Sequence, residues 1–126
     1  MTREPYGTPT SFGFPKSARI LRTSDVRKAY NKGTRIASPY FAAFCLQLPR
    51  EPGEGPRLGF TVPRAFGNSV LRNRVKRRMR EVLRIRFQEI APEWDIVINP
   101  RRAALKATPE ELRRELDRLV TRCGKQ

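Results

Sequence analysis

A strand pattern followed by a long amphipathic helix pattern, in the middle of the chain, constrains the fold most. Residues 57–63, RLGFTVP, predict a strand that ends at Pro63. Asn68 is a predicted N-cap for a helix that continues to about Ile90, with Pro92 just beyond. One side of this helix is apolar and comprises Leu71, Val75, Met79, Val82, Leu83 and Ile90. Because that side must be buried, the segment predicts a helix packed on a sheet.

Two further helices are predicted on either side of this segment. Ser24 and Asp25 indicate the start of a short helix that ends at Gly33. Residues 108–111, TPEE, combine a threonine cap, a proline in the first position and a glutamate in the third, which predicts the start of a last helix. The buried side of that last helix would carry Leu112, Leu116, Leu119 and Val120.

Three more strands complete the expected fold, at residues 34–37, 40–48 and 95–99. In 40–48 both alternating sets of side chains are mostly apolar, so either helices cover both faces of the sheet or one face is an apolar binding cleft. The order α-β-β-β-α-β-α predicts an α/β domain, an α+β two-layer sandwich with about four strands in a small mixed sheet and three helices.

The charge of the chain is large and concentrated. The 126 residues contain 27 Lys and Arg against 12 Asp and Glu, a net charge of +15. Residues 57–86 alone hold ten basic residues and one acid. A cationic excess confined to one segment indicates a binding surface for a polyanion, most plausibly nucleic acid.

Several classes of catalytic site are excluded by composition. The chain has no histidine, so no catalytic triad, general base or metal site can use one, and its two cysteines cannot form a four-ligand zinc site. The carboxylates form no obvious cluster for two Mg²⁺ ions. We therefore expect no catalytic residue and no metal ligand in this chain. The cysteines are interpreted as reduced thiols of a cytoplasmic protein, and no segment predicts a membrane span or signal peptide.

The segment 58–83 carries a motif that resembles the protein subunit of bacterial ribonuclease P. Residues 72–77, RNRVKR, match that family's Arg-Asn-Arg motif and its continuation, and Gly67-Asn68 and the strand GFTV at 59–62 match what precedes it. The opening Phe14-Pro15, the first helix and the strand WDIVI at 94–98 extend the resemblance over about residues 14–123. Val26 and Ala65 depart from the aromatic and basic residues that many relatives carry there.

The resemblance implies a function and a fold. Family members bind a large catalytic RNA, and the complex removes the 5′ leader of precursor tRNA. The RNA carries the active site and holds most of the Mg²⁺, with no organic cofactor. The partners implied are ribonuclease P RNA and precursor tRNA, with one protein per RNA and no membrane. The fold implied is the α/β sandwich of the second domain of a small-subunit ribosomal protein, with a left-handed βαβ crossover.

Two candidate surfaces follow from the resemblance and the side-chain chemistry. The first would face the catalytic RNA and comprises Arg64, Asn68, Arg72, Asn73, Arg74, Lys76, Arg77 and Arg80. The second is a cleft between the first helix and one sheet face, which would bind the leader through Val26, Tyr30, Ala42 and Phe44. Arginine engages phosphate bidentately, and aromatic rings stack on bases of any sequence.

The expected organisation is a flexible arm at residues 1–16, one domain at 17–123 and a tail at 124–126. Two other classes of protein stay open on charge and size alone: a ribosomal or other structural RNA-binding protein, and a DNA-binding protein that inserts the 68–90 helix into the major groove. An autonomous protein nuclease is the weakest alternative, because the catalytic groups are missing.

Overall fold

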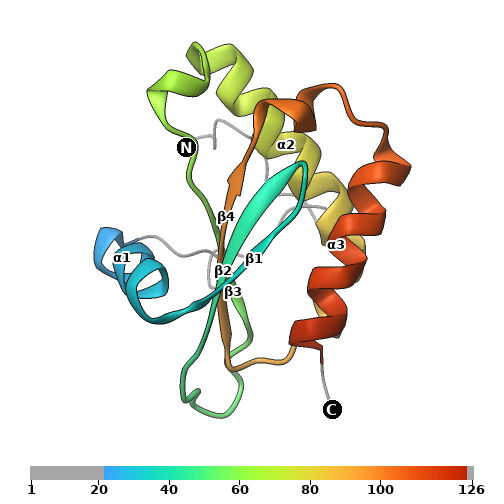
Figure 1. The fold of residues 1–126 in the computed structure, drawn as a ribbon. Helices are drawn as coiled ribbons and strands as arrows, with labels where there is room; N and C mark the ends of the chain where they lie inside the picture. The colour runs from blue at the N-terminus through green and yellow to red at the C-terminus, as the bar shows by residue number, and fades with distance from the viewer. Residues whose placement is uncertain (1–21, 125–126) are drawn as a thin grey trace, which may run out of the picture.

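The computed structural model describes residues 22–124, and their order of elements confirms the predicted α+β class. Figure 1 shows these helices and strands, which are α1 (Thr23–Lys32), β1 (Thr34–Ala37), β2 (Phe41–Gln47), β3 (Arg57–Phe60), α2 (Ser69–Arg86), β4 (Trp94–Pro100) and α3 (Pro109–Cys123). The predicted arm at 1–16 and residues 125–126 of the predicted tail lie outside the described residues. None of the helices in the described range is long and apolar enough to cross a membrane.

The strands form one mixed sheet in the order β1-β2-β4-β3. β1 pairs with β2, and β2 with β4, in antiparallel register, whereas β3 and β4 are parallel. A parallel pair needs a crossover connection, and α2 supplies it between β3 and β4. This arrangement leaves β3 at one edge of the sheet, directly before the turn that leads into α2.

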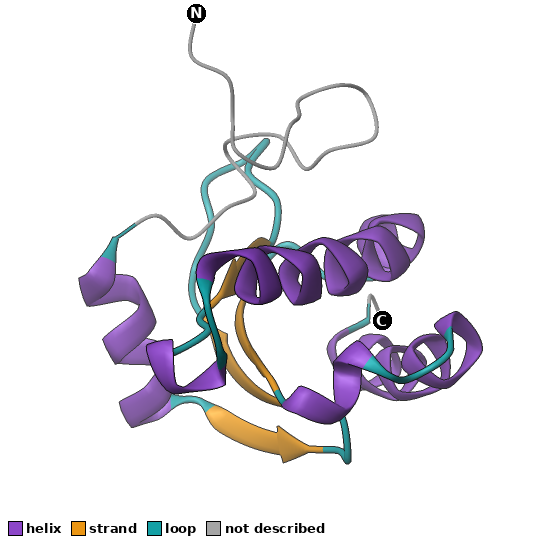
Figure 2. Cartoon of the chain, turned by 90° about the horizontal axis from the view of Figure 1, so that it is seen from above, coloured by secondary structure: helices purple, strands orange, loops and turns teal. Residues whose placement is uncertain are grey.

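Helices lie against both faces of the sheet, which resolves the ambiguity of the apolar strand at 40–48. Phe41, Ala43 and Cys45 point into the main core, which lies between the sheet and the pair α2 and α3. The alternate residues face α1, where Ala29 and Val97 form the centre of a smaller core. Figure 2 shows α1 on the opposite side of the sheet from α2 and α3.

The apolar stripes and two of the predicted helix caps are confirmed. Val75, Met79 and Leu83 of α2 are fully buried. The side chain of Asn68 accepts a hydrogen bond from the Leu71 backbone at 3.0 Å. The capping box of α3 is complete, because the Thr108 hydroxyl accepts from the backbone of Glu111 at 3.1 Å while the Glu111 carboxylate accepts from the backbone of Thr108 at 2.8 Å.

The ends of β2 and β4 lie within one residue of the sequence prediction, and the boundaries of α1, α2 and β3 also differ from it. α1 begins at Thr23, one residue before the predicted start at Ser24. Its N-cap residue is Arg22, which makes no side-chain capping hydrogen bond. Asp25 lies in the first turn instead, 3.4 Å from Arg57. α2 ends at Arg86 and continues as a 3₁₀ turn, and β3 ends at Phe60 rather than Pro63.

The two cysteines are far apart in the sequence but meet in the main core as free thiols. Cys45 lies on β2 and Cys123 at the end of α3, and both side chains are buried. Burial and the hydrogen bond with Cys123 raise the pKa of the Cys45 thiol, the hydrogen bond being the larger cause. The pair therefore packs as two small core residues.

Candidate nucleic-acid interface

A tight turn before α2 sets where the predicted RNA-binding helix begins. Gly67 has φ 155°, a conformation that side chains disfavour, and an added Cβ would lie 2.9 Å from Leu71 Cδ1. Arg72 Nε donates to the Gly67 carbonyl at 3.2 Å. Arg102 donates to the Phe66 carbonyl and lies over the Phe66 ring, 5.7 Å from its centroid. Arg72, a member of the first predicted surface, thus also holds this turn.

Three arginines of the first predicted surface project freely. Arg64 in the turn and Arg74 and Arg77 on α2 are exposed, and none has a hydrogen-bond or ion-pair partner within residues 22–124. An unpaired guanidinium keeps all five of its N–H donors available for phosphate. Within the first predicted surface, these three side chains are therefore the cations with the most donors available to a polyanion.

The remaining members of that surface are partly used within the protein. Arg80 lies over the Phe60 ring of β3, 5.3 Å from its centroid, and is half-buried. Asn73 and Lys76 are half-buried on the same side of α2, since residues three and four apart share a helix face. Asn68 uses its side-chain oxygen as the helix cap. The eight predicted residues thus separate into three exposed arginines, two residues that hold the start of α2 (Asn68 and Arg72), and a half-buried row at Asn73, Lys76 and Arg80, of which Arg80 contacts β3.

Two other cations of α2 hold the fold together. Arg78 donates to the carbonyls of Ala104, at 3.2 Å, and Ala107, which fixes the segment before α3. Arg86 donates to both carboxylate oxygens of Glu89, at 2.7 and 2.9 Å, and also contacts Asp117. These hydrogen bonds raise the pKa of Arg86 and lower that of Glu89.

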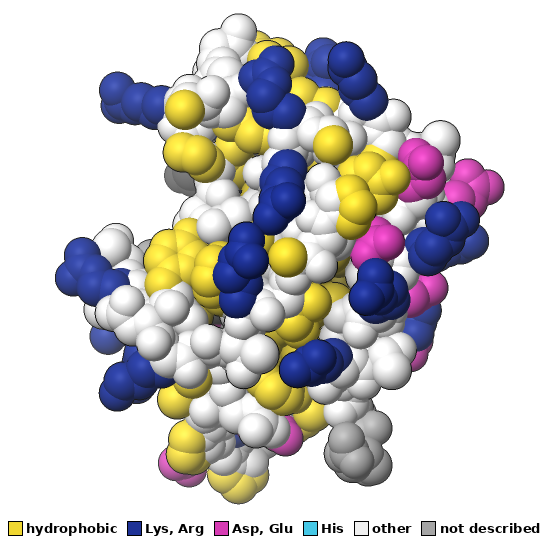
Figure 3. Space-filling model, in the orientation of Figure 1, with side chains coloured by type: hydrophobic (Ala, Val, Ile, Leu, Met, Phe, Trp, Pro, Cys, Tyr) yellow, Lys and Arg dark blue, Asp and Glu magenta, His cyan; other side chains and the backbone are white. Residues whose placement is uncertain are grey.

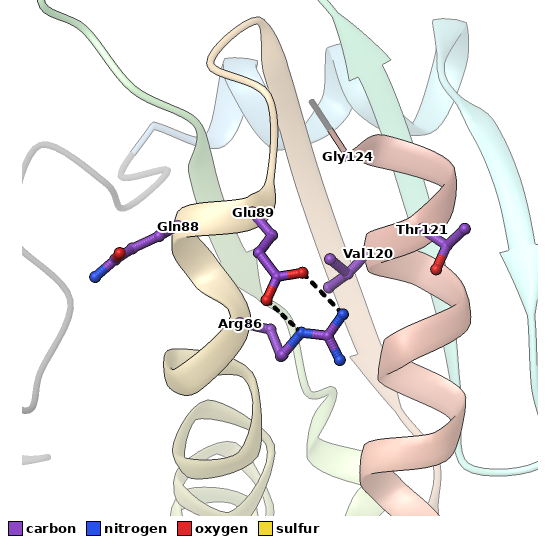
Figure 4. Close-up of a pocket in the computed structure, with 6 residues that line it drawn as sticks. All are labelled: Arg86, Gln88, Glu89, Val120, Thr121 and Gly124. Carbon is purple, nitrogen blue, oxygen red and sulfur yellow. Dashed lines mark hydrogen bonds and ion pairs between the residues drawn. The ribbon is translucent and has the colours of Figure 1, made fainter. Parts of the chain in front are cut away.

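Figure 4 shows a pocket at this far end of α2, where Arg86 and Glu89 face each other. Arg86 forms ion pairs with Glu89 and Asp117. Because its guanidinium is neutralised by two acids, this pocket offers no unpaired cation from Arg86 to an anionic ligand.

The four residues of the predicted leader cleft lie together between α1 and the sheet. Ala42 is buried and Tyr30 is 38% exposed. The Tyr30 and Phe44 rings meet edge to face, with centroids 4.7 Å apart. Val26 and Phe44 pack on the smaller core. Tyr30 is thus the more available ring, whereas Phe44 supports it from below.

Two polar residues of this cleft were missed by sequence reasoning. The Tyr30 hydroxyl lies 2.6 Å from the Thr61 hydroxyl and donates to Asn99 Oδ1 at 2.9 Å, and the Thr61 hydroxyl contacts the same oxygen. We call these three residues the Tyr30 cluster. Asn99 could have been placed here because it lies two residues after Val97 and so on the same face of the strand. No local pattern pointed to Thr61.

The cationic helix and the cleft are adjacent at the β3 edge. Phe60 lies under Arg80 on the side of α2, whereas the next residue, Thr61, points to the opposite face and joins the Tyr30 cluster. Figure 3 shows the outline hollowed between α1 and the turn before α2, with hydrophobic atoms inside the hollow and Lys and Arg side chains around it. One extended polyanion could therefore contact both surfaces.

Acidic and sulfur ligands are not gathered anywhere in the described part of the chain. Within residues 22–124, no three side chains among His, Cys, Asp and Glu lie close enough to hold a metal ion.

Together the fold and this interface define a small, strongly basic α+β protein with an arginine-rich helix beside an aromatic cleft. A family model described as Ribonuclease P matches residues 14–124. The chain therefore belongs to the ribonuclease P protein family.

Individual relatives agree with this assignment. The chain is 35% identical over 108 residues to the ribonuclease P protein component of Acidothermus cellulolyticus, covering 86% of this chain and 89% of that protein. It is 31% identical over 117 residues to that of Desulfosudis oleivorans, covering 93% and 94%. Among solved structures it is similar to the RNase P proteins of Thermotoga maritima (TM-score 0.70, 26% identity, covering 85% and 98%) and Staphylococcus aureus (TM-score 0.69, 28% identity, covering 84% and 94%).

Proposed function

We propose that this chain is the subunit of a ribonucleoprotein that binds ribonuclease P RNA and the 5′ leader of precursor tRNA, and so promotes Mg²⁺-dependent cleavage at the mature 5′ end. The observation that carries the proposal is a set of three exposed arginines, Arg64, Arg74 and Arg77, that have no partner among residues 22–124 and lie on the turn and helix that meet the aromatic cleft at the β3 edge. Cations neutralise phosphates, and rings stack on unpaired bases without regard to sequence. Membership of the ribonuclease P protein family favours ribonuclease P RNA as the polyanion over DNA and over ribosomal or other structural RNA.

In this proposal the RNA holds the Mg²⁺ ions and carries the cleavage chemistry, and no organic cofactor takes part. The chain contributes binding free energy and relief of phosphate repulsion around those ions. Arg64, Arg74 and Arg77 make the main phosphate contacts, with Arg72 and the row at Asn73, Lys76 and Arg80 beside them. One protein binds one RNA in the cytoplasm.

The leader lies in the cleft, with a base on the exposed ring of Tyr30. Stacking on an aromatic side chain is worth about 1–3 kcal/mol per base and tolerates any base. An enzyme that processes many different precursors needs this tolerance. Phe44 and Val26 act mainly by supporting α1 and the Tyr30 ring, because both pack on the smaller core.

The test compares precursor and mature tRNA binding to the holoenzyme reconstituted with a bacterial ribonuclease P RNA. Wild-type protein should give tighter binding of the precursor, and Tyr30→Ala should lower precursor affinity by at least about fivefold while mature tRNA affinity stays unchanged. Equal weakening of both substrates would contradict the leader role. Arg118→Ala on α3 serves as the control that should change neither affinity, because its side chain is 71% exposed and, among residues 22–124, is paired only with Glu115.

A further inference from the structure

We propose that Arg102 is a positioning residue for RNA binding, because it fixes the turn before α2 and so sets the direction in which Arg64 meets a phosphate. Arg102 lies beyond β4 and is not a member of the surface predicted from the sequence. The inference rests on the proposed function, because it concerns how one phosphate contact of that function is held in place.

The turn that carries Arg64 is short and closed by local bonds. It contains the 3₁₀ helix η2 (Arg64–Phe66), which follows the end of β3. The Phe66 backbone donates to the Pro63 carbonyl at 3.0 Å, and the Gly67 backbone donates to the Arg64 carbonyl at 3.1 Å. Hydrogen bonds of this 3₁₀ type have poor geometry and form only short pieces. The direction of Arg64 therefore depends on contacts from other elements.

Arginine side chains satisfy the two carbonyls at the end of this turn. The first hydrogen bond of α2 joins the Arg72 backbone to the Asn68 carbonyl at 3.0 Å, so the carbonyls of Phe66 and Gly67 precede the helical ladder. Arg72 Nε donates to the Gly67 carbonyl at 3.2 Å, and Arg102 donates to the Phe66 carbonyl. Because Arg72 belongs to α2 itself, Arg102 is the arginine that ties the turn to a different part of the chain.

Arg102 is held firmly enough to serve as this tie. It opens the 3₁₀ helix η4 (Arg102–Leu105), which lies beside α2 (Figure 1). Arg78 of α2 donates to the Ala104 carbonyl at 3.2 Å, so η4 is itself fixed on α2. The Arg102 guanidinium lies over the Phe66 ring, 5.7 Å from its centroid, and Phe66 is only 5% exposed. The turn, η4 and α2 thus form one connected unit.

The charge of this unit indicates a role in RNA binding beyond stability. Arg64, Arg72 and Arg102 belong to the turn or contact it, and within residues 22–124 none of them is paired with a carboxylate. Like charges repel, so three guanidinium groups around one turn oppose its folding. Neutral donors would satisfy the same carbonyls without this repulsion, whereas a bound phosphate relieves it.

Removing the Arg102 contact should weaken RNA binding through Arg64. A turn that is no longer fixed samples several directions, and binding must then order it. We expect Arg102→Met to lower the affinity for ribonuclease P RNA about 3- to 10-fold, the effect of one lost hydrogen bond. The methionine keeps an apolar stem beside Phe66 but has no N–H to donate.

A double-mutant cycle separates positioning from direct contact with RNA. The affinity of the full chain for ribonuclease P RNA is measured with Arg64→Ala, with Arg102→Met and with both changes, under conditions in which urea denaturation shows each variant to be folded. In the Arg64→Ala background, Arg102→Met should weaken binding by less than about twofold. In the background of Arg74→Ala, a change within α2, it should keep its full effect.

Two further measurements separate this role from a uniform loss of charge or stability. Lys106→Met removes an exposed cation at the end of η4 and should change RNA affinity by less than about twofold. Hydrogen exchange of the Gly67 amide should be at least about threefold faster in Arg102→Met than in wild type or Lys106→Met, while the amides of β4 stay protected. Arg102→Gln, which also lacks the guanidinium, replaces Arg102→Met if the methionine variant does not fold.

The inference is overturned if Arg102→Met keeps wild-type affinity, or if the Gly67 amide of this variant exchanges at the wild-type rate. An equally large effect in the Arg64→Ala background would also overturn it, because Arg102 would then contact the RNA directly. Failure of the wild-type protein to bind ribonuclease P RNA would instead contradict the proposed function. Wild-type binding without any effect of Arg102→Met would remove only the positioning role.

Discussion

Asp95 shows how single residues hold the sheet edge in place for the interface. Asp95 is 1% exposed, and its carboxylate accepts hydrogen bonds from Arg57 at 2.7 and 3.0 Å, and from Arg50. Arg50 also donates to the Pro92 carbonyl at 3.1 Å, and Arg57 reaches Asp25 of α1. The hydrogen bond to Asp95 raises the pKa of Arg57. One buried acid thus joins β3, β4, α1 and the loop after β2.

Replacing Asp95 should lower the free energy of unfolding much more than replacing an exposed acidic residue. Asp95→Ala leaves two partly buried guanidinium groups without their partner, and we expect the free energy of unfolding to fall by about 3 kcal/mol or more. Glu81→Gln, which breaks an exposed pair with Arg84 on α2, should change it by less than about 0.5 kcal/mol. Urea denaturation measures both. Similar losses for the two variants would show that the buried network is not the stabilising element.

At the scale of whole elements, the capping box of α3 makes the stability of that helix depend on pH. Hydrogen bonds from the Thr108 backbone, and then from its side chain and from Tyr40, lower the pKa of Glu111 below its usual 4.5. Because the folded-state pKa is depressed, the stabilisation is fully present above that value and is lost as the pH falls through the lower pKa of the folded state.

Thermal melting as a function of pH tests this linkage. Wild type should lose melting temperature as the pH falls below about 4.5, and Glu111→Gln should lose less over the same range, because it has no carboxylate to protonate. Glu110→Gln, at the neighbouring exposed position, is the control that should follow the wild-type curve. Identical curves for wild type and Glu111→Gln would contradict the linkage.

The exposed arginines of α2 also act at the scale of an element. The salt dependence of RNA affinity measures how many phosphate contacts they make. Arg74→Ala combined with Arg77→Ala should weaken binding of ribonuclease P RNA and reduce the slope of log affinity against log salt by about 0.7–0.9 for each lost phosphate contact. Stability should change little, because both side chains are exposed. An unchanged slope would exclude these arginines from the phosphate interface. Arg118→Ala on α3 is again the comparison.

Elements were predictable from the sequence where local chemistry defines them. The caps at Asn68 and Thr108 and the apolar stripe of α2 depend on residues within one or two turns of each other. The place of Thr61 in the Tyr30 cluster was not predictable, because the cluster joins α1, the end of β3 and β4 through tertiary packing. The start of α1 was misplaced for a similar reason, since Asp25 pairs with Arg57 instead of capping the helix.

At the scale of the whole molecule, the parallel β3–β4 pair determines where the cationic surface of α2 and the aromatic cleft lie relative to each other. The crossover through α2 brings Arg80 over Phe60 at the sheet edge, while Thr61 turns to the opposite face beneath α1. The cationic side chains of α2 and the aromatic cleft therefore lie around one edge. This arrangement is compatible with the proposed contact of one protein with a catalytic RNA and its substrate.

Cleavage of precursor tRNA at low Mg²⁺ tests the central claim most directly. Bacterial ribonuclease P RNA is incubated with precursor in the presence and absence of this protein, and the protein is also assayed alone. We predict accurate cleavage at the mature 5′ end only when RNA and protein are both present. Failure to stimulate any of several ribonuclease P RNAs, or cleavage by the protein alone, would contradict the account.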